Sequence, residues 1–370
     1  MNVALVGKLN PADGVVVYTR QLAERLAADG HSAEITHFSD RGSQAQQSAG
    51  SLPHLIRTQG YTLPAPGAYG VLARRLSAQP ADLVHAQLPV SPLDFLLPRL
   101  TRKLRIPLIG TFHHGWDYRP TKFGLVGQAV ARAYAPALAR YDRVIVFGPR
   151  LQREFTKLGV AEERLAVVPN GVDVQEYRPG ASEYRLADKL RVTYMGRMSP
   201  DKNVQELVET FVAAARPELV LTLVGAGPLY AGLHARYGQH PGLQFVGFVA
   251  DAEERKSIWR GTDVVVLPSP IEGLSLSLLE GMASGCMPVA TDVGEHESVL
   301  QGVGLTMDPR TVKTDLAAAW QHLAAGRQGV AAAGRAAREH VVKHFSAELH
   351  WQRLRAVYDS VVEQRPVGGA

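Results

Sequence analysis

The sequence contains a single cysteine, Cys286, so no disulfide can form within the chain. Long apolar runs are absent as well, because no stretch approaches the roughly 18 uninterrupted apolar residues that predict a membrane-spanning helix. The first residues, MNVALVGKLNPADG, lack the basic segment, the longer apolar segment and the small-residue cleavage site of a secretory signal. We therefore expect a cytoplasmic protein.

Several ligand-binding signatures are also missing. The first apolar run is followed only by Gly7 and Gly14, whereas the dinucleotide fingerprint G-x-G-x-x-G needs three glycines, which argues against a nicotinamide enzyme. The sequence has no Asp-x-Asp metal motif and no zinc-finger spacing. It also lacks the aromatic signature of RNA-binding modules, so we do not expect a nucleic acid partner.

The charged residues are unevenly distributed along the chain. The net charge is +5, but residues 1–170 hold 20 Lys and Arg against 12 Asp and Glu. A basic first half suggests an acidic partner, such as anionic lipid headgroups or a phosphorylated substrate. The densest basic group is Arg99, Arg102, Lys103 and Arg105, and the solvated face of a basic helix explains it equally well.

Short apolar runs alternate with longer amphipathic stretches, a pattern that restarts halfway along the chain. The first set of runs lies at 1–7, 32–38, 81–87, 106–114 and 142–148, and the second at 189–197, 219–227, 243–249, 262–270, 287–294 and 302–308. Uninterrupted apolar strands separated by helices predict parallel sheets covered on both faces. The chain is therefore expected to be of the α/β class, with two doubly wound units in series.

The best boundary between these units is 167–185, which has turn dipeptides and little helical periodicity. We expect an N-terminal Rossmann-like domain at 1–168 and a C-terminal Rossmann-like domain at 169–345. A final helix at 346–370 either closes the second domain or crosses back to the first. Residues 41–70 are rich in Gln, Ser, Gly and Pro and are predicted to form a surface loop.

Ligands of open α/β sheets bind beyond the carboxyl ends of the strands. Gly14 follows the first run, where a backbone turn approaches a helix N-terminus, although a plain turn explains it as well. Arg197 and Lys202 follow another strand and suit a diphosphate, but a solvated turn remains the alternative. His113 and His114 follow a third, and at most one of them is expected to act on a substrate.

The stretch SPIEGLSLSLLEGMASGCMPVA places Glu272 and Glu280 in apolar surroundings. Burying a carboxylate is costly unless it is paired or hydrogen-bonded. Ser277 and Glu280 match the capping box S-x-x-E, which accounts for Glu280 alone. On a functional interpretation, both carboxylates accept sugar hydroxyls, and the amides of residues 274–276 at a helix N-terminus hold a phosphate.

With these motifs, the sequence resembles the retaining, nucleotide-sugar-dependent glycosyltransferases of family 4, which have the GT-B fold. VVPNGVD, YMGRMSPDKN, LVGAGP, FVGFV and DVVVLPSPIEGLSLSLLEGMASGCMPVATDVGEHE occur in the family's order and approximate spacing. Each motif is weak by itself, whereas the ordered set is specific. The likeness covers nearly the whole chain and is strongest from residue 165 to 300. It implies that the domain at 1–168 binds the acceptor and that the domain at 169–345 binds the nucleotide sugar.

The resemblance implies a role for each matching residue. Arg197 and Lys202 match the pair that neutralises the donor diphosphate. Glu272 matches the glutamate at the donor sugar's hydroxyls, and Glu280 matches the glutamate that binds the ribose. His113 matches the histidine of the family's T-x-H pattern near the reaction centre.

The remaining matches concern the backbone around the donor. The amides of Leu274, Ser275 and Leu276 are expected to hold phosphate, Gly14 matches the first glycine-rich loop, and Val249 lies where the family's chain meets the nucleobase. The chain departs from the family's E-G-F-G at Leu274 and Ser275, which bears on donor preference. The first loop also has one glycine where two are common.

The resemblance further implies a metal-independent enzyme of the hexosyltransferase type, without a cofactor, that uses a UDP- or GDP-sugar donor. The acceptor is expected to be a glycan or a lipid, in glycolipid or polysaccharide biosynthesis. The basic first domain suggests peripheral contact with the inner face of the membrane. The alternatives are a nucleotide-sugar epimerase or hydrolase on the same fold, and a non-catalytic nucleotide-sugar-binding protein.

Overall fold

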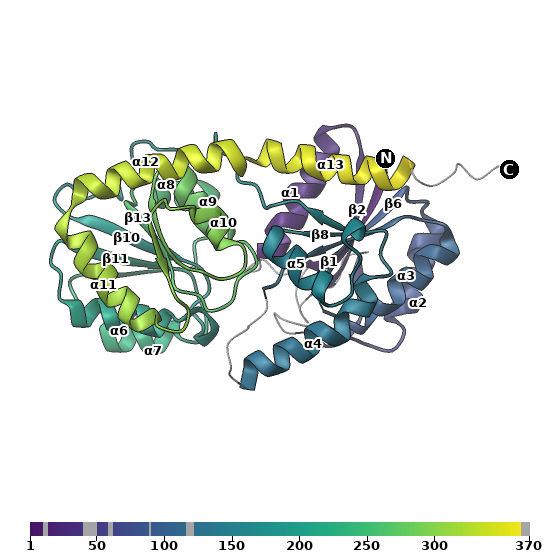
Figure 1. The fold of residues 1–370 in the computed structure, drawn as a ribbon, viewed down its shortest axis with the longest axis horizontal. Coiled ribbons are helices and arrows are strands. Elements are labelled where there is room, and N and C mark those ends of the chain that lie inside the picture. Colours follow the sequence, from purple (N-terminus) through teal and green to yellow (C-terminus); the bar gives the residue numbers. More distant parts are fainter. Residues whose placement is uncertain (10–13, 40–49, 58–61, 89, 116–121, 364–370) are drawn as a thin grey trace. The chain divides into compact units, whose positions relative to one another are not determined.

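The chain forms two compact units of parallel sheet and helix (Figure 1). The structure, a computed structural model, describes residues 1–9, 14–39, 50–57, 62–88, 90–115 and 122–363. The first unit comprises Met1–His114, Lys122–Val168 and the chain from Gln352 onward. The second comprises Pro169–Trp351 together with Gly115 and the residues that follow it. Each unit is described by itself below.

The first unit is built on a seven-stranded parallel sheet in the order β3-β2-β1-β6-β7-β8-β9. Its strands are β1 (Asn2–Leu9), β2 (Ser32–Ser39), β3 (Ser51–Leu52), β6 (Leu83–Leu88), β7 (Leu108–Phe112), β8 (Arg143–Val146) and β9 (Leu165–Val167). The helices are α1 (Gly14–Ala28), α2 (Ala68–Ala78), α3 (Pro92–Leu104), α4 (Lys122–Leu138), α5 (Pro149–Lys157) and the short η2 (Glu162–Arg164). The final helix, α13 (Ala347–Glu363), contributes its residues from Gln352 onward.

The prediction of a surface loop at 41–70 is wrong for the part that the structure describes. Strand β3 pairs in parallel with β2, and β4 (His54–Arg57) pairs antiparallel with β5 (Thr62–Pro64). Leu52 and Thr62 are buried, and α2 already begins at Ala68. These strands are too short to show a period in the sequence, and their backbone pairing rather than their composition decides their structure. Residues 41–49 and 58–61 lie outside the described residues.

The second unit contains a six-stranded parallel sheet in the order β12-β11-β10-β13-β14-β15. Its strands are β10 (Leu190–Met195), β11 (Leu219–Val224), β12 (Leu243–Gly247), β13 (Val264–Leu267), β14 (Met287–Thr291) and β15 (Leu305–Met307). The helices are η3 (Pro200–Lys202), α6 (Val204–Ala214), α7 (Tyr230–Tyr237), α8 (Ala252–Arg260), α9 (Leu276–Ala283), α10 (His296–Leu300), α11 (Val312–Ala325) and α12 (Arg327–His344). Both units are doubly wound, which confirms the predicted α/β class.

The strand order reverses between β10 and β13, so the loops after these two strands flank the switch point of the second sheet. Open α/β sheets bind ligands at such a point. The loop after β10 carries Arg197 and Lys202, and the loop after β13 carries Glu272. The fold therefore places these three predicted site residues in the two loops that flank the switch point.

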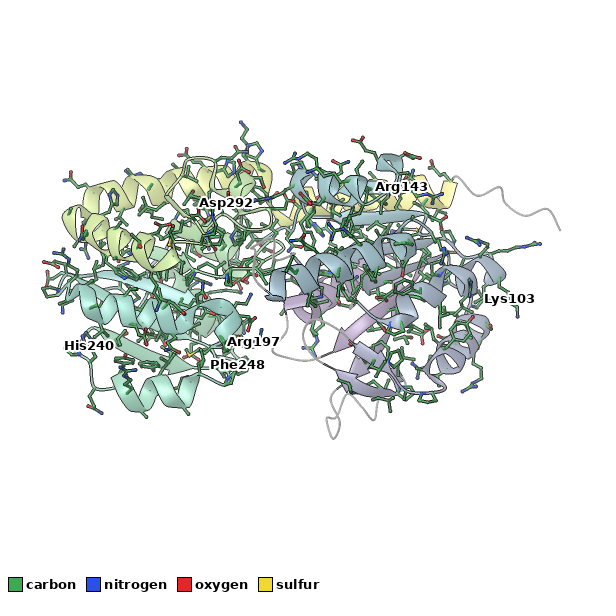
Figure 2. All side chains as sticks on the ribbon, turned by 60° about the horizontal axis from the view of Figure 1, so that its bottom comes forward. Lys103, Arg143, Arg197, His240, Phe248 and Asp292 are labelled. Carbon is green, nitrogen blue, oxygen red and sulfur yellow. The ribbon has the colours of Figure 1, made fainter. Side chains whose placement is uncertain are left out.

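The basic group predicted at 99–105 lies at the carboxyl end of α3. That helix begins with a capping box, in which Ser91 accepts from the Leu93 amide and Asp94 accepts from the Ser91 amide at 2.7 Å. Arg102 and Lys103 lie in its last turn, where cations interact favourably with the helix dipole (Figure 2). A solvated helix end thus accounts for this group. No helix of the described residues is both long and apolar enough to cross a membrane.

Candidate functional site

Two cations follow β10 and each is paired with a carboxylate. The Lys202 Nζ lies 2.5 Å from Glu272 Oε1, and the Arg197 Nη2 lies 2.8 Å from Asp201 Oδ2. The side chains of Lys202 and Glu272 are 21% and 15% exposed, so this ion pair is sheltered but reachable from solvent. Figure 2 labels Arg197 at the edge of the second unit. The arrangement offers two cations to an anionic ligand without leaving either one unpaired beforehand.

The loop that carries Arg197 is supported from behind by the glycine-rich turn after β11. Gly225 has a φ of +133°, and a Cβ added to it would lie 1.9 Å from the carbonyl oxygen of Gly196. The two turns are also joined by hydrogen bonds, from the Met198 amide to the Ala226 carbonyl at 2.9 Å and from the Leu229 amide to the Met198 carbonyl at 3.0 Å. The motif LVGAGP therefore has a structural role here, because only glycine allows this approach.

Glu272 is held in its ionised form. Burial raises the pKa of its carboxyl. Lys202 and, more weakly, His296 lower this pKa by more than burial raises it, so the pKa of Glu272 lies below its ordinary value. The backbone around Glu272 is fixed by the turn after β14, where the Glu295 amide donates to the Gly273 carbonyl at 2.9 Å. An ionised carboxylate in a fixed backbone is suited to accept hydrogen bonds from hydroxyl groups.

The capping box predicted at Ser277 and Glu280 is wrong. Helix α9 begins at Leu276, and the residue that caps it is Ser275, whose hydroxyl accepts from the Leu278 amide at 3.4 Å and lies 3.0 Å from the Ser277 hydroxyl. The serine two residues earlier takes the cap because Ser277 already lies inside the first turn. The first amides of a helix have no intrahelical acceptor, so the N-terminus of α9 remains able to bind an anion.

Glu280 lies one turn into α9 in different surroundings. The Trp259 Nε1 donates to Glu280 Oε2 at 3.3 Å, and the hydroxyl of Tyr177 and the guanidinium of Arg255 also favour the charged form. Burial outweighs these contributions, so the pKa of Glu280 lies above its ordinary value. The two glutamates of the motif therefore have pKa values shifted in opposite directions.

Val249 and Phe248 follow β12 at the edge of the second sheet. Val249 is 7% exposed, and its carbonyl accepts from Arg255 at 3.3 Å, which fixes the backbone at this point. Phe248, labelled in Figure 2, is 57% exposed. The backbone at Val249 is thus positioned by a contact within the second unit.

The remaining two predicted residues lie in the first unit. His113 follows β7, is partly exposed, and has its Nε2 2.5 Å from Gln87 Oε1. Gly14 is the first residue of α1, and residues 10–13 of its loop lie outside the described residues. The structure thus joins Lys202 and Glu272 directly. Arg197, Leu274, Ser275, Leu276, Val249 and Glu280 belong to the same second unit, and His113 and Gly14 belong to the first.

Sequence reasoning missed several residues that support the site. The Asn170 Nδ2 donates to the Leu274 carbonyl at 2.9 Å and thereby holds the start of α9. His296 is fully buried, has its Nδ1 3.0 Å from the Thr291 carbonyl, and contributes to the low pKa of Glu272. The motif VVPNGVD was a signal for Asn170, whereas nothing in the sequence indicated that Trp259 contacts Glu280. The described residues contain no group of three or more His, Cys, Asp or Glu that could hold a metal ion.

Two known families match the sequence of this chain. The sequence profile of "Glycosyltransferase Family 4" matches residues 12–176, and that of "Glycosyl transferases group 1" matches residues 189–325. The two profiles follow one another and together cover most of the chain.

The chain belongs to the family 4 glycosyltransferases.

The chain is also similar in sequence to individual members of known families. It is 28% identical over 313 residues to the phosphatidyl-myo-inositol mannosyltransferase of Mycobacterium tuberculosis, an alignment that covers 78% of this chain and 76% of that protein. The chain spans about half the length of the first curated relatives that it matches, 54% of one and 52% of the other.

Two solved structures show the GT-B fold of the chain. Sucrose-phosphate synthase from Thermosynechococcus elongatus superposes with a TM-score of 0.77 at 22% identity, covering 99% of this chain and 100% of that one. HepE of Anabaena in complex with UDP-glucose gives 0.75 at 18% identity, covering 96% and 99%. The GT-B fold implied by the sequence resemblance is therefore confirmed.

Gly225→Ala tests the support behind the Arg197 loop. The added Cβ collides with backbone and its φ is strained, so we expect the second unit to lose about 1–3 kcal/mol of stability, measured as a lower thermal midpoint. Gly232→Ala is the matched control, because Gly232 lies inside α7 with nothing within 4 Å of its added Cβ. That change should raise stability slightly. Equal midpoints for the two variants would contradict the structural role of Gly225.

Glu272→Gln and Glu280→Gln test the opposite pKa shifts. Glu272→Gln leaves Lys202 unpaired, so the thermal midpoint at pH 7 should fall by roughly 2–6 °C. This loss should shrink as the pH falls through the lowered pKa of Glu272, because the ion pair is then lost in the unmodified protein too.

Glu280→Gln should behave in the reverse way. The folded state disfavours an ionised Glu280, so removing its charge should raise the midpoint, and the gain should grow as the pH rises through the raised pKa of Glu280. Calorimetric scans from about pH 3 to about pH 8, which extend below the ordinary pKa of a glutamate, measure both variants. Parallel pH profiles for the two variants would sink the assignment of opposite shifts.

Proposed function

We propose that the protein is a retaining glycosyltransferase that moves a sugar from a UDP- or GDP-sugar to an acceptor hydroxyl, in glycolipid or polysaccharide biosynthesis. The observation that carries this proposal is the pair of Lys202 and Glu272 at the switch point of the second sheet, beside the N-terminus of α9. A cation, an ionised carboxylate and free helix amides in one place match a diphosphate joined to a sugar. The similarity to a protein that binds UDP-glucose supports the same donor class.

The charges of the site explain how a donor would be bound. Arg197 and Lys202 are offset by Asp201 and Glu272, so the four side chains together are neutral before a ligand arrives. A diphosphate then takes the place of the carboxylates as partner of the two cations, and Glu272 turns to the sugar hydroxyls. Glu280 accepts from the ribose, and the amides of Leu274, Ser275 and Leu276 face phosphate.

These groups also account for the transfer. Breaking the bond between the sugar and the diphosphate leaves negative charge on the phosphate, which Arg197, Lys202 and the helix N-terminus stabilise without reorganisation. The acceptor hydroxyl attacks the anomeric carbon from the face that the diphosphate leaves, which retains the configuration, and its proton goes to the departing phosphate. Because side chains and amides neutralise the leaving group, the proposed reaction uses no metal and no cofactor. His113, at the end of β7, is proposed to act near the reaction centre.

Two other functions remain to be separated by experiment. A nucleotide-sugar epimerase or hydrolase would convert the donor without an acceptor, and a non-catalytic protein would bind the donor without turnover. Incubation with UDP- and GDP-sugars, with and without a membrane lipid extract, distinguishes them. Release of nucleoside diphosphate that depends on the extract supports the transferase.

Lys202→Ala and Glu272→Ala should each lower kcat by about 100-fold or more, because both groups act on charge or hydroxyls at the reacting end of the donor. Lys189→Ala is the matched control, since this exposed lysine directly precedes β10 at the opposite end of the strand from the site. The measurement is the rate of nucleoside diphosphate release, with circular dichroism to verify folding. Near-normal rates in both site variants would refute the assignment.

The first unit offers a surface for an acceptor with an apolar part. Leu125 and Val126, in the first turn of α4, are each 62% exposed, and Val130 is 38% exposed. Helix α4 contains Lys122 and Arg132 and no acidic residue. Because α4 follows a parallel strand, its first turns lie at the carboxyl edge of the sheet, where ligands bind. We propose that a lipid acceptor binds at these turns of α4, which make peripheral contact with an anionic membrane surface.

Leu125→Asp tests this contact. Placing a carboxylate on the apolar turn should lower co-sedimentation with vesicles of phosphatidylcholine and phosphatidylglycerol at low salt, because it removes apolar area and adds repulsion. Leu55→Asp is the control, since Leu55 on β4 is also an exposed leucine of the first unit, at 51%. Equal vesicle binding by the two variants would refute α4 as the contact.

A further inference from the structure

One face of the first unit's sheet carries a line of buried polar side chains. His85 and Gln87 on β6 and Thr111 on β7 point to the same face and are at most 1% exposed. Tyr18 of α1 and Tyr358 of α13 cover them from the helix layer and are also buried. Parallel strands that are covered on both faces are ordinarily apolar, so this line calls for a functional reason.

Hydrogen bonds connect three members of this line, Tyr358, His85 and Thr111. The Tyr358 hydroxyl lies 2.6 Å from His85 Nδ1, and His85 Nε2 lies 2.6 Å from the Thr111 hydroxyl. Thr111 lies opposite Gln87 in the register of β6 and β7, so the two side chains are neighbours on this face. Thr111 also opposes the rise that burial causes in the pKa of Tyr18, which places it near the Tyr18 hydroxyl. A neutral imidazole with both nitrogens engaged donates through one and accepts through the other, so His85 transmits a single hydrogen-bond direction.

The line ends at His113. Gln87 Oε1 lies 2.5 Å from His113 Nε2, and the ring of Tyr18 meets the ring of His113 edge to face at 4.9 Å between centroids. An amide oxygen only accepts, so His113 carries a hydrogen on Nε2. On the neighbouring strand β1, a Cβ added to Gly7 would lie 3.0 Å from the Cβ of Gln87, which shows how closely Gln87 is enclosed.

We propose that this line positions His113, and that Tyr358 of the C-terminal helix is a positioning residue for it, acting through His85, Thr111 and Tyr18. Gln87 and Tyr18 hold the imidazole in one orientation and one tautomer, and the hydroxyl of Tyr358 sets the direction of the hydrogen bonds behind them. The functional consequence rests on the proposed role of His113 near the reaction centre. Docking of α13 onto the first unit thereby becomes a condition for a correctly oriented His113.

Tyr358→Phe tests the proposal because it removes only the hydroxyl. The nitrogen resonances of His113, measured on protein labelled with ¹⁵N-histidine and assigned with His113→Gln, report the tautomer directly. We expect them to move toward a mixture of the two tautomers. In donor-transfer assays, we expect a several-fold fall in kcat with an unchanged KM for the donor.

Tyr141→Phe is the matched control. Tyr141 is also fully buried in the first unit and donates one hydrogen bond, to the Asp94 carbonyl at 3.1 Å, but it is not part of the line. We expect Tyr141→Phe to lower the thermal midpoint about as much as Tyr358→Phe does, but to leave the His113 resonances unchanged. Movement of the His113 resonances in Tyr141→Phe as large as in Tyr358→Phe would overturn the proposal.

Thr111→Val keeps the test decisive if Tyr358→Phe does not fold. It removes the central hydroxyl at nearly constant volume and should move the His113 resonances. Thr111→Ser keeps the hydroxyl and should leave these resonances where they lie in the unmodified protein. Unchanged resonances in Thr111→Val would also overturn the proposal. The spectroscopic result does not need turnover, so a protein that shows these shifts and transfers no sugar from any donor refutes the proposed function and leaves the positioning intact.

Discussion

The ion pair between Lys202 and Glu272 is the interaction on which the second unit's site depends. Lys202 follows β10 and Glu272 follows β13, so the pair joins the two sides of the switch point of the sheet. The turn after β14 is attached to the same segment, through the hydrogen bond from the Glu295 amide to the Gly273 carbonyl. Three loops that come from separate strands are therefore held in register by one sheltered pair and its neighbours. Breaking it leaves a charge without a partner, which is more costly than never having built the pair.

The two glutamates of the motif show how one helix start provides two kinds of carboxylate. Glu272 precedes α9 and is paired with Lys202, whose charge outweighs the effect of burial. Glu280 lies one turn inside, where burial outweighs the hydrogen bonds of Trp259 and Tyr177 and the charge of Arg255. Their pKa values move apart for that reason. Ionising Glu280 in the folded protein thus costs more free energy than ionising Glu272, although the two side chains are chemically identical. This cost lowers the stability of the fold, and hydroxyl donors of a bound ligand would offset it.

The sequence was sufficient to locate most of the site but not its supports. Uninterrupted apolar strands predict the parallel sheets, and the ordered motifs place Arg197, Lys202 and Glu272 at strand ends, because these features depend on residues close in sequence. The contact of Trp259 with Glu280, that of Asn170 with Leu274 and the line that ends at Tyr358 join residues far apart in the chain. Such contacts have no period and no local signature. The short strands at 51–57 and 62–64 were missed because pairing, not composition, decides them.

Ser275 illustrates a limit on how this site can change over evolutionary time. Its hydroxyl caps α9 at the place where family members often have glycine, so a position that we propose to face the donor phosphate also fixes the helix start. The residues tolerated at this position are those that can still cap a helix: serine, threonine, aspartate, asparagine and glycine. Of these, aspartate would set a negative charge against a phosphate. Few substitutions are therefore compatible with the helix, and under the proposed function a change of donor preference at this position is coupled to the stability of α9.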